Sequence, residues 1–263
     1  KIDDSKIHRH DIEFLLREAK KQLILNDKNQ SIIHIFNHNY IVDGKIFIEE
    51  PINVFADSLT HEMTFITAPK NNLRNINQIF LDCDIEIERI ISQTFALGVE
   101  LFDIRELQSG VVLIHLGSKK ISLGLFKNLA LVHSITFPFG TDYITNDISK
   151  VCSLNLEESL AIRSNVDFSF KNNQNLFDEK NLLKKSFFID SKFRKISKNL
   201  IFKIIKARTD EIFEMIKKQL TLTRFNFNSG TSLFLAGEGS NLINIEKYCQ
   251  NFFKLNTIKK RND

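Results

Sequence analysis

The stretch that decides the fold runs from Val111 to Arg163 and reads VVLIHLGSKKISLGLFKNLALVHSITFPFGTDYITNDISKVCSLNLEESLAIR. It opens with an apolar run, VVLIH, that is typical of a buried strand. A short turn follows at residues 116–120, then two more strand-like runs, ISLGLF and LALVHSITF, and a helix that begins near residues 140–145. The stretch therefore predicts three consecutive strands and a helix, with a small-residue turn between the first two strands.

The composition indicates one large domain or two modest ones. The chain has 263 residues, and 43% of them are hydrophobic, so it can bury a sizeable core. The net charge of +4 is spread along the chain, and no basic stripe alternates with aromatic residues, which argues against nucleic-acid binding. No run approaches the roughly 20 apolar residues of a membrane span, and no signal peptide is visible.

The cysteines and histidines show no pattern of a disulfide framework or a metal site. Three cysteines lie far apart without a CxxC pair, which fits a reducing compartment. His8 and His10 form an HxH pair, and His34 and His38 are four residues apart. Those spacings do not converge on a metal unless the chain folds them together, so we expect no metal site. We also find no Ser/His/Asp or Cys/His arrangement, and assign no catalytic residue.

The first 107 residues predict a small α+β unit. Apolar residues at helical spacing predict helices over residues 6–25 and 71–81. Runs of β type predict strands over residues 31–36, 40–42, 45–49, 63–67 and 85–90. Asp43-Gly44 lies between the second and third of these runs and is a hairpin signal.

The last hundred residues predict a loop, a long helix and a second glycine turn. Residues 165–184 are polar and Asn-rich and indicate a loop or weak hairpin, and residues 196–220 indicate a long helix. A short buried strand, Leu233–Ala236, then runs into GEGSN at residues 237–241 and a helix that ends at Phe253. A strand, a glycine turn and a helix in this order are a candidate cradle for a phosphate or nucleotide.

With both turns in place, the chain resembles the bacterial cell-division protein FtsA of the actin-like ATPase superfamily. Three segments carry the resemblance: FITAPKNNLRNINQIFLDCDIEIERIISQTFALG in subdomain 1C, IIKARTDEIFEMI in the long helix and SLFLAGEGSNLINI at the adenosine side. The resemblance implies an α/β fold with an actin-like (ribonuclease H-like) core domain and a small α+β 1C subdomain. The pilus assembly protein PilM has a similar layout.

The resemblance also implies a division into subdomains. Residues 1–107 correspond to subdomain 1C with its connection back to the core. Residues 108–163 and 226–263 correspond to subdomain 2A, and residues 164–225 to subdomain 2B. We expect the chain to be the centre of an FtsA-like protein, lacking the N-terminal phosphate loop and the C-terminal membrane helix of that family.

The resemblance implies a nucleotide site whose chemistry has changed. Its candidate residues are Gly117, Ser118, Lys119, Lys120, Arg163, Gly237, Glu238, Gly239 and Ser240. His115 stands where the family has an Asp, and a neutral imidazole is a poor substitute for a carboxylate near Mg²⁺. Glu238 replaces a Gly, and its charge opposes phosphate if it points inward. We expect weak binding of ATP with Mg²⁺ and slow or absent hydrolysis.

The cationic candidates each have a structural alternative. Lys119 and Lys120 either neutralise phosphate or form a solvated hairpin tip. Arg163 stands where the family tends to have a Lys near the nucleotide, although Leu160 replaces the neighbouring acidic residue. It either contacts a base or phosphate, or is a surface residue of a helix.

The second glycine turn has two compatible interpretations. Gly237 and Gly239 let a backbone approach a base or phosphate without a Cβ clash. Ser240 and Asn241 are expected to cap the helix that follows.

A partner surface is implied on the long helix. Arg208 and Glu211 are helical neighbours in subdomain 2B, which the resemblance implies contacts the C-terminal tail of FtsZ; the alternative is a plain surface ion pair. Asp147, in the segment TNDI, matches the family's TxDI pattern, and we expect it to have a structural role near a helix N-terminus.

The function implied is that of a cell-division factor at septum formation. It ties FtsZ filaments to the membrane, polymerises with further copies of itself and recruits later division proteins through 1C. The inner membrane is reached only through a segment absent from this chain, at the cytoplasmic face of the division site. Two alternatives stay open: a PilM-like pilus assembly adaptor and a catalytically active actin-like ATPase.

Overall fold

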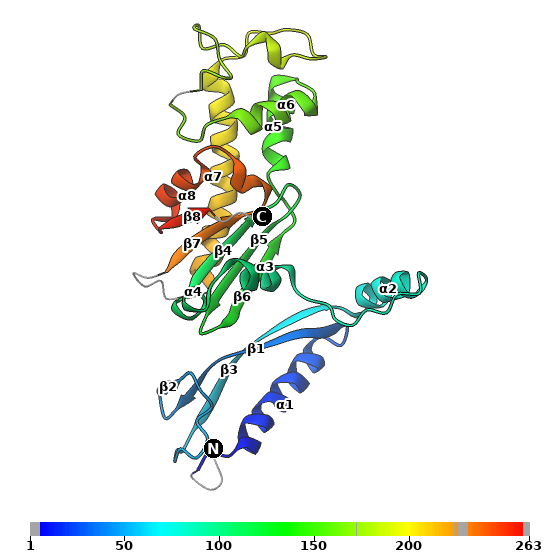
Figure 1. Ribbon diagram of the computed structural model, residues 1–263, viewed down its shortest axis with the longest axis vertical. Helices are drawn as coiled ribbons and strands as arrows, with labels where there is room; N and C mark the ends of the chain where they lie inside the picture. The colour runs from blue at the N-terminus through cyan, green and yellow to red at the C-terminus, as the bar shows by residue number, and fades with distance from the viewer. Residues whose placement is uncertain (1–5, 172, 224, 226–230, 260–263) are drawn as a thin grey trace. The chain divides into compact units, whose positions relative to one another are not determined.

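The computed structural model describes residues 6–171, 173–223, 225 and 231–259, and it shows an α/β chain that divides into two compact units (Figure 1). The first unit comprises residues 1–110 and 124–134, and the second comprises residues 111–123 and 135–263.

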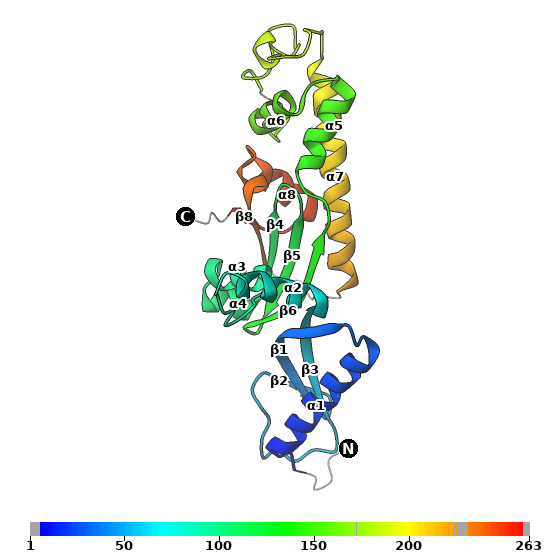
Figure 2. The ribbon, with the colours of Figure 1, turned by 90° about the vertical axis from the view of Figure 1, so that its right-hand side faces the viewer.

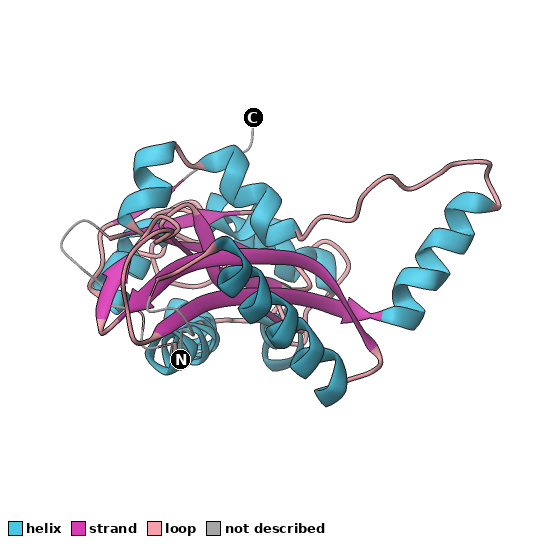
Figure 3. Cartoon of the chain, turned by 90° about the horizontal axis from the view of Figure 1, so that it is seen from below, coloured by secondary structure: helices cyan, strands magenta, loops and turns pink. Residues whose placement is uncertain are grey.

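The first unit is built on a three-stranded sheet with the strand order β2-β1-β3. Its elements are α1 (Arg9–Asn26), β1 (Gln30–Val42), β2 (Lys45–Phe47), β3 (Leu59–Pro69), α2 (Lys70–Leu81), α3 (Gln93–Leu101) and α4 (Ile104–Ser109). β1 pairs antiparallel with both of its neighbours. α1 lies across one face of the sheet (Figure 3), where its Ile12 joins a buried cluster with Tyr40 and Val42. Burial of this apolar face holds the helix on the sheet.

Most of the predicted elements of the first unit are confirmed, with two differences. The helices over residues 6–25 and 71–81 and the hairpin at Asp43-Gly44 are present. The runs at residues 31–36 and 40–42 belong to one strand, β1, because bulges in its pairing with β3 break the alternation of side chains.

The strand predicted over residues 85–90 is wrong, because those residues form no strand. Their alternation of acidic and apolar side chains is typical of a strand. A strand also needs a neighbour whose backbone groups pair with its own, and the pattern alone does not supply one.

The five-stranded sheet has the order β6-β5-β4-β7-β8. Its strands are β4 (Val111–Leu116), β5 (Ile121–Lys127), β6 (Ala130–Phe137), β7 (Ser232–Ala236) and β8 (Thr257–Lys259). The three consecutive strands predicted from residues 111–137 are confirmed. β4 and β7 are parallel neighbours, in register from Val111 opposite Ser232 to His115 opposite Ala236. Their carboxyl ends therefore lie at one edge of the sheet, which is where ligands bind in open α/β sheets.

The helices of the second unit are α5 (Asp142–Cys152), α6 (Leu156–Asn165), α7 (Lys198–Leu222) and α8 (Ile245–Phe253), with short 3-10 turns η1 (Lys185–Phe187) and η2 (Glu238–Asn241). α7 lies alongside α5 (Figure 2). It buries an apolar stripe at helical spacing that includes Ile201, Ile205, Ile212 and Ile216. Among the described residues, none of the helices combines the length and apolar character that a membrane span requires.

The turn predicted at residues 237–241 and the helix predicted to end at Phe253 are both present, but the helix begins later than predicted. η2 is followed by Asn244 in the left-handed region (φ 59°), and α8 begins only at Ile245. Ser240 and Asn241 therefore do not cap α8, and the cap prediction is wrong. The Ser240 hydroxyl instead donates to the Gly237 carbonyl at 2.7 Å and stabilises η2.

Candidate functional site

The site lies where β4 and β7 end and α5 begins. The turn after β4 is closed by the Gly117 N–H, which donates to the Lys120 carbonyl at 3.1 Å. The N–H of Thr141 donates to the Gly117 carbonyl at 3.0 Å, and that of Asp142 donates to the Ser118 carbonyl at 2.9 Å. These bonds satisfy backbone groups at the start of α5 and fix the turn to this helix.

The turn after β7 packs directly on the end of β4. Gly237 has φ 83°, and a Cβ at this position would lie 2.9 Å from the Leu116 carbonyl oxygen. A Cβ at Gly239 would lie 2.8 Å from the Cβ of Leu116. Both distances are shorter than a side chain tolerates, so glycine is required here for close packing within the chain. The side on which we expected a phosphate to approach these glycines faces the chain's own β4.

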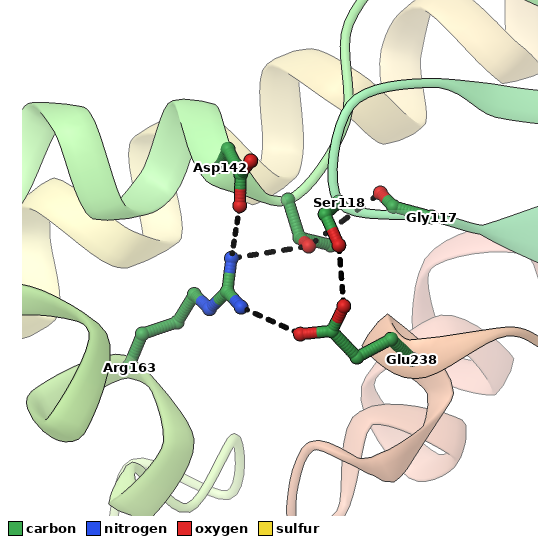
Figure 4. A network of polar contacts seen from close by, with 6 residues as sticks. Gly117, Ser118, Asp142, Arg163 and Glu238 are labelled. Carbon is green, nitrogen blue, oxygen red and sulfur yellow. Dashed lines mark hydrogen bonds and ion pairs between the residues drawn. The ribbon is translucent and has the colours of Figure 1, made fainter.

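A network around Arg163 joins the two turns (Figure 4). Arg163 lies on α6, and its Nη1 donates to Thr141 Oγ1 at 3.1 Å and to Asp142 Oδ1 at 3.3 Å. Its Nη2 donates to Glu238 Oε1 at 3.2 Å, and the other oxygen of that carboxylate accepts from the Ser118 hydroxyl. One guanidinium therefore connects α6, the start of α5 and η2.

Burial shows that Arg163 is not the surface residue of our second interpretation. Its side chain is 4% exposed, whereas the side chains of Asp142 and Glu238 are 42% and 60% exposed. A buried charge is stable only when partners compensate it. Two carboxylates do so here. Their two negative charges outnumber the single positive charge of the guanidinium.

His115 is the imidazole that stands in place of a carboxylate near the first turn. Burial lowers the pKa of His115, and nearby Lys120 lowers it further, so the ring is neutral at pH 7. Its Nδ1 is buried and has no hydrogen-bond partner within the described part of the chain. Lys119 and Lys120 are both exposed on the turn.

Arg208 and Glu211 lie on α7. Arg208 Nε donates to Asp147 Oδ2 at 2.6 Å, and its Nη1 pairs with Glu211 Oε2 at 2.5 Å. The guanidinium also lies 5.7 Å from the ring centroid of Tyr143. The hydrogen bond that Arg208 donates to Asp147 is the main cause that raises the pKa of Arg208. Asp147 lies inside α5 rather than near its N-terminus, and its contact with Arg208 connects α5 to α7.

Sequence reasoning missed the contribution of Thr141 and Asp142 to the site. A Thr and an Asp at the start of a predicted helix are a recognised N-terminal signal, so the pattern could have been found. It also missed the role of Glu158, which lies three residues after Asn155 in the spacing of a capping box.

The cofactor that the resemblance implies, a nucleoside triphosphate with Mg²⁺, does not fit this arrangement. Arg163 and Ser118, which supply the charged and hydroxyl donors, are both engaged by Glu238. The carboxylates of Asp142 and Glu238 would face the phosphates at close range. Within the ranges that the structure describes, no three His, Cys, Asp or Glu side chains are grouped so as to hold a metal ion.

The chain has relatives of known name. A family model described as the SHS2 domain inserted in FtsA matches residues 1–67. The cell division protein FtsA of Neisseria meningitidis is 25% identical over 258 residues, which is 97% of this chain and 61% of that protein. FtsA of Buchnera aphidicola (subsp. Schizaphis graminum) is 24% identical over 83% of this chain and 51% of its own length.

The chain is similar to the cell division protein FtsA of several bacteria. FtsA of Pseudomonas aeruginosa is also similar, at 21% identity over 97% of this chain and 60% of that protein. The resemblance to FtsA is therefore confirmed along nearly the whole chain. The chain spans between 51% and 61% of the length of these three FtsA proteins.

Solved structures confirm the actin-like fold. The PilM-PilN type IV pilus biogenesis complex matches 97% of this chain and 63% of that chain, with a TM-score of 0.61 at 12% identity. MreB5 of Spiroplasma citri, bound to AMPPNP, matches 73% of this chain and 60% of its own, with a TM-score of 0.56 at 15% identity. At such low identities the likeness extends to the fold alone.

Proposed function

We propose that this chain acts as a cell-division protein of the FtsA type, an actin-like scaffold that links FtsZ filaments to the membrane and recruits later division proteins. The observation that carries the proposal is the match to FtsA proteins over as much as 97% of the chain. The match of residues 1–67 to a domain described as inserted in FtsA supports it further, because that domain lies in the first compact unit.

The proposal assigns a role to each subdomain. Subdomain 1C, residues 1–107, contacts neighbouring copies in a filament and later division proteins. Subdomain 2B, residues 164–225, contacts the C-terminal tail of FtsZ. Subdomain 2A, residues 108–163 and 226–263, supplies the core. The protein works at the cytoplasmic face of the inner membrane at the division site.

The site around Arg163 and Glu238 is, under this proposal, the nucleotide position of the actin-like core. We expect ATP to bind weakly there, with no efficient hydrolysis. The neutral His115 in place of a carboxylate supports this expectation, since Mg²⁺ prefers oxygen ligands. An efficient actin-like ATPase is therefore disfavoured. The likeness to PilM concerns the fold, and it gives no separate support to a pilus adaptor.

Binding of the FtsZ tail tests the proposal. A fluorescent peptide with that sequence from the same organism is titrated with the chain, and anisotropy is measured. Arg208 is already paired with Asp147 and Glu211, so Arg208→Glu would place three carboxylates together and loosen the contact between α5 and α7. Arg208→Gln is the cleaner variant. Lys206→Gln is the matched control, because this exposed residue lies two positions away on another side of α7.

We expect saturable binding that Arg208→Gln weakens about fivefold or more and Lys206→Gln leaves nearly unchanged. Thermal melts of the variants check that each is folded. A folded wild-type chain that does not bind the peptide would contradict the proposed partner.

A further inference from the structure

Glu238 is held as a bound anion would be held. Its two carboxylate oxygens accept hydrogen bonds from different groups, one from the guanidinium of Arg163 and one from the hydroxyl of Ser118 (Figure 4). The start of α5 lies at the same place, since Asp142 and Thr141 also contact the guanidinium. A guanidinium and a hydroxyl are groups with which proteins bind phosphate.

We infer that the carboxylate of Glu238 is a built-in competitor of nucleoside triphosphates, which occupies the guanidinium of Arg163 and the hydroxyl of Ser118 in the absence of a nucleotide. The inference rests on the proposal that the place where these residues meet is the nucleotide position of the fold. It adds a mechanism to that proposal, because the side chain of Glu238 alone then accounts for the weak binding of ATP.

Backbone packing keeps Glu238 in place. Gly237 adopts φ 83° and packs against Leu116, with the result that the start of η2 is fixed to the end of β4. Glu238 is the first residue of η2, so its side chain starts from a fixed backbone position beside the β4–β5 turn. A phosphate chain that displaced the carboxylate from Arg163 would still lie near its negative charge.

Electrostatics favours the internal anion over an external one. Arg163 is almost fully buried, and its charge is compensated twice, by Asp142 and by Glu238. A triphosphate would bring several more negative charges to a place where the carboxylates already exceed the guanidinium. Glu238→Gln removes one repelling charge and leaves one acceptor oxygen in place of two, so Nη2 of Arg163 and the hydroxyl of Ser118 no longer each have an acceptor of their own at residue 238.

A neutral variant at residue 238 is expected to fold. In Glu238→Gln, Arg163 keeps its contacts with Thr141 and Asp142, so the buried charge stays compensated. The matched control is Glu157→Gln, which makes the same change of charge on the exposed side of α6.

The test is calorimetric titration of the full 263-residue chain with ATP and Mg²⁺, and separately with inorganic tripolyphosphate. We expect Glu238→Gln to bind ATP at least about tenfold more tightly than the wild type, and Glu157→Gln to bind like the wild type. The affinities for tripolyphosphate should follow the same order among the wild type and the two variants, because the increase in affinity comes from contacts with the phosphate chain. Adding Ser118→Ala to Glu238→Gln should reduce the gain, since it removes one of the two donors that Glu238 occupies in the wild type.

Three results would overturn the inference: equal affinities of the wild type and Glu238→Gln, no binding by either, or the same gain in Glu157→Gln. The peptide titration with the same preparations keeps the two proposals apart. A gain in Glu238→Gln without binding of the FtsZ peptide would reject the proposed partner and keep the competitor. Binding of the peptide without tighter ATP binding by Glu238→Gln would keep the proposed partner and reject the competitor.

Discussion

Glu158 and Arg163 are two buried charged residues of α6 with different structural roles. Arg163 connects α6 to the start of α5 and to η2, whereas Glu158 holds a loop. The Glu158 carboxylate accepts hydrogen bonds from the backbone N–H groups of three consecutive residues: Ile189 at 2.7 Å, Asp190 at 3.0 Å and Ser191 at 2.9 Å. Burial by itself raises the pKa of Glu158, but the hydrogen bonds, with those from Ser191 the strongest, outweigh it and lower the pKa to about 2.

Glu158→Gln should therefore destabilise the chain, although the side chain keeps its volume. The new side-chain NH₂ group would face the N–H groups of residues 189–191, which are also donors. Those backbone groups would lose a charged acceptor. We expect a loss of about 2–3 kcal/mol in the free energy of unfolding, measured with urea. Glu157→Gln, the exposed neighbour, should change it by less than about 0.5 kcal/mol. Equal effects of the two variants would show that Glu158 does not hold the loop.

The same carboxylate gives a pH dependence with a defined sign. Its pKa in the folded chain, about 2, lies below the ordinary value of 4.5, so the unfolded chain takes up the proton first. The stabilisation is complete above pH 4.5 and is lost as the pH falls towards 2. Glu158→Gln lacks this carboxyl group. The difference in the free energy of unfolding between wild type and variant should therefore decrease as the pH falls from 4.5 towards 2. A constant difference would contradict the assignment.

Among the elements, α5 and α7 are joined through Arg208. The bond to Asp147 spans two helices, and both side chains are 26% exposed. The bond to Glu211 lies within α7, and the side chain of Glu211 is 54% exposed. Partial burial strengthens the first pair relative to the second, because solvent screens an exposed pair more strongly.

Double-mutant cycles should rank the two pairs. With alanine at each position, we expect a coupling of about 1 kcal/mol between Arg208 and Asp147. The coupling between Arg208 and Glu211 should be about 0.3 kcal/mol, typical of neighbours on one helix. Urea unfolding of the single and double variants gives both values. A larger coupling within α7 than between the helices would reverse this interpretation of Arg208.

Across the whole molecule, the partly buried histidines whose pKa is lowered are concentrated in the first unit. His34, His38, His61 and His133 belong to it, and burial is the main cause that lowers the pKa of each. Of the described residues in the second unit, His115 has a pKa lowered in the same way. The unfolded chain therefore takes up these protons first, and stability falls as the pH drops below the ordinary value of 6.5.

Acidification should consequently loosen the first unit before the second. Between about pH 7.5 and about pH 5.5, we expect hydrogen exchange, corrected for its intrinsic rate, to accelerate more in residues 30–69 than in residues 111–116. His61→Phe should reduce the acceleration, because the ring keeps its stacking on Tyr40 (4.3 Å between centroids) and loses two nitrogens that have no partner among the described residues. Equal acceleration in both units would contradict this prediction.

The sequence by itself determined those elements whose pattern is local. The apolar runs between residues 111 and 137 are long and buried, and hence predicted β4, β5 and β6 correctly. Helical spacing predicted α1 and α7, and the turn chemistry of Asp43-Gly44 predicted the hairpin. The positions of the two glycine turns also followed from their neighbours in the chain, since each comes directly after a buried strand.

Only the tertiary structure decided what these turns contact. Arg163 and Glu238 are 75 residues apart, and Ser118 and Glu238 are 120 apart, so no local pattern encodes their bonds. The same holds for residues 85–90, whose alternation predicts a strand although no neighbour pairs with them. Spacing along a chain reports which side chains share a face, whereas burial and pairing depend on which segments meet when the chain folds.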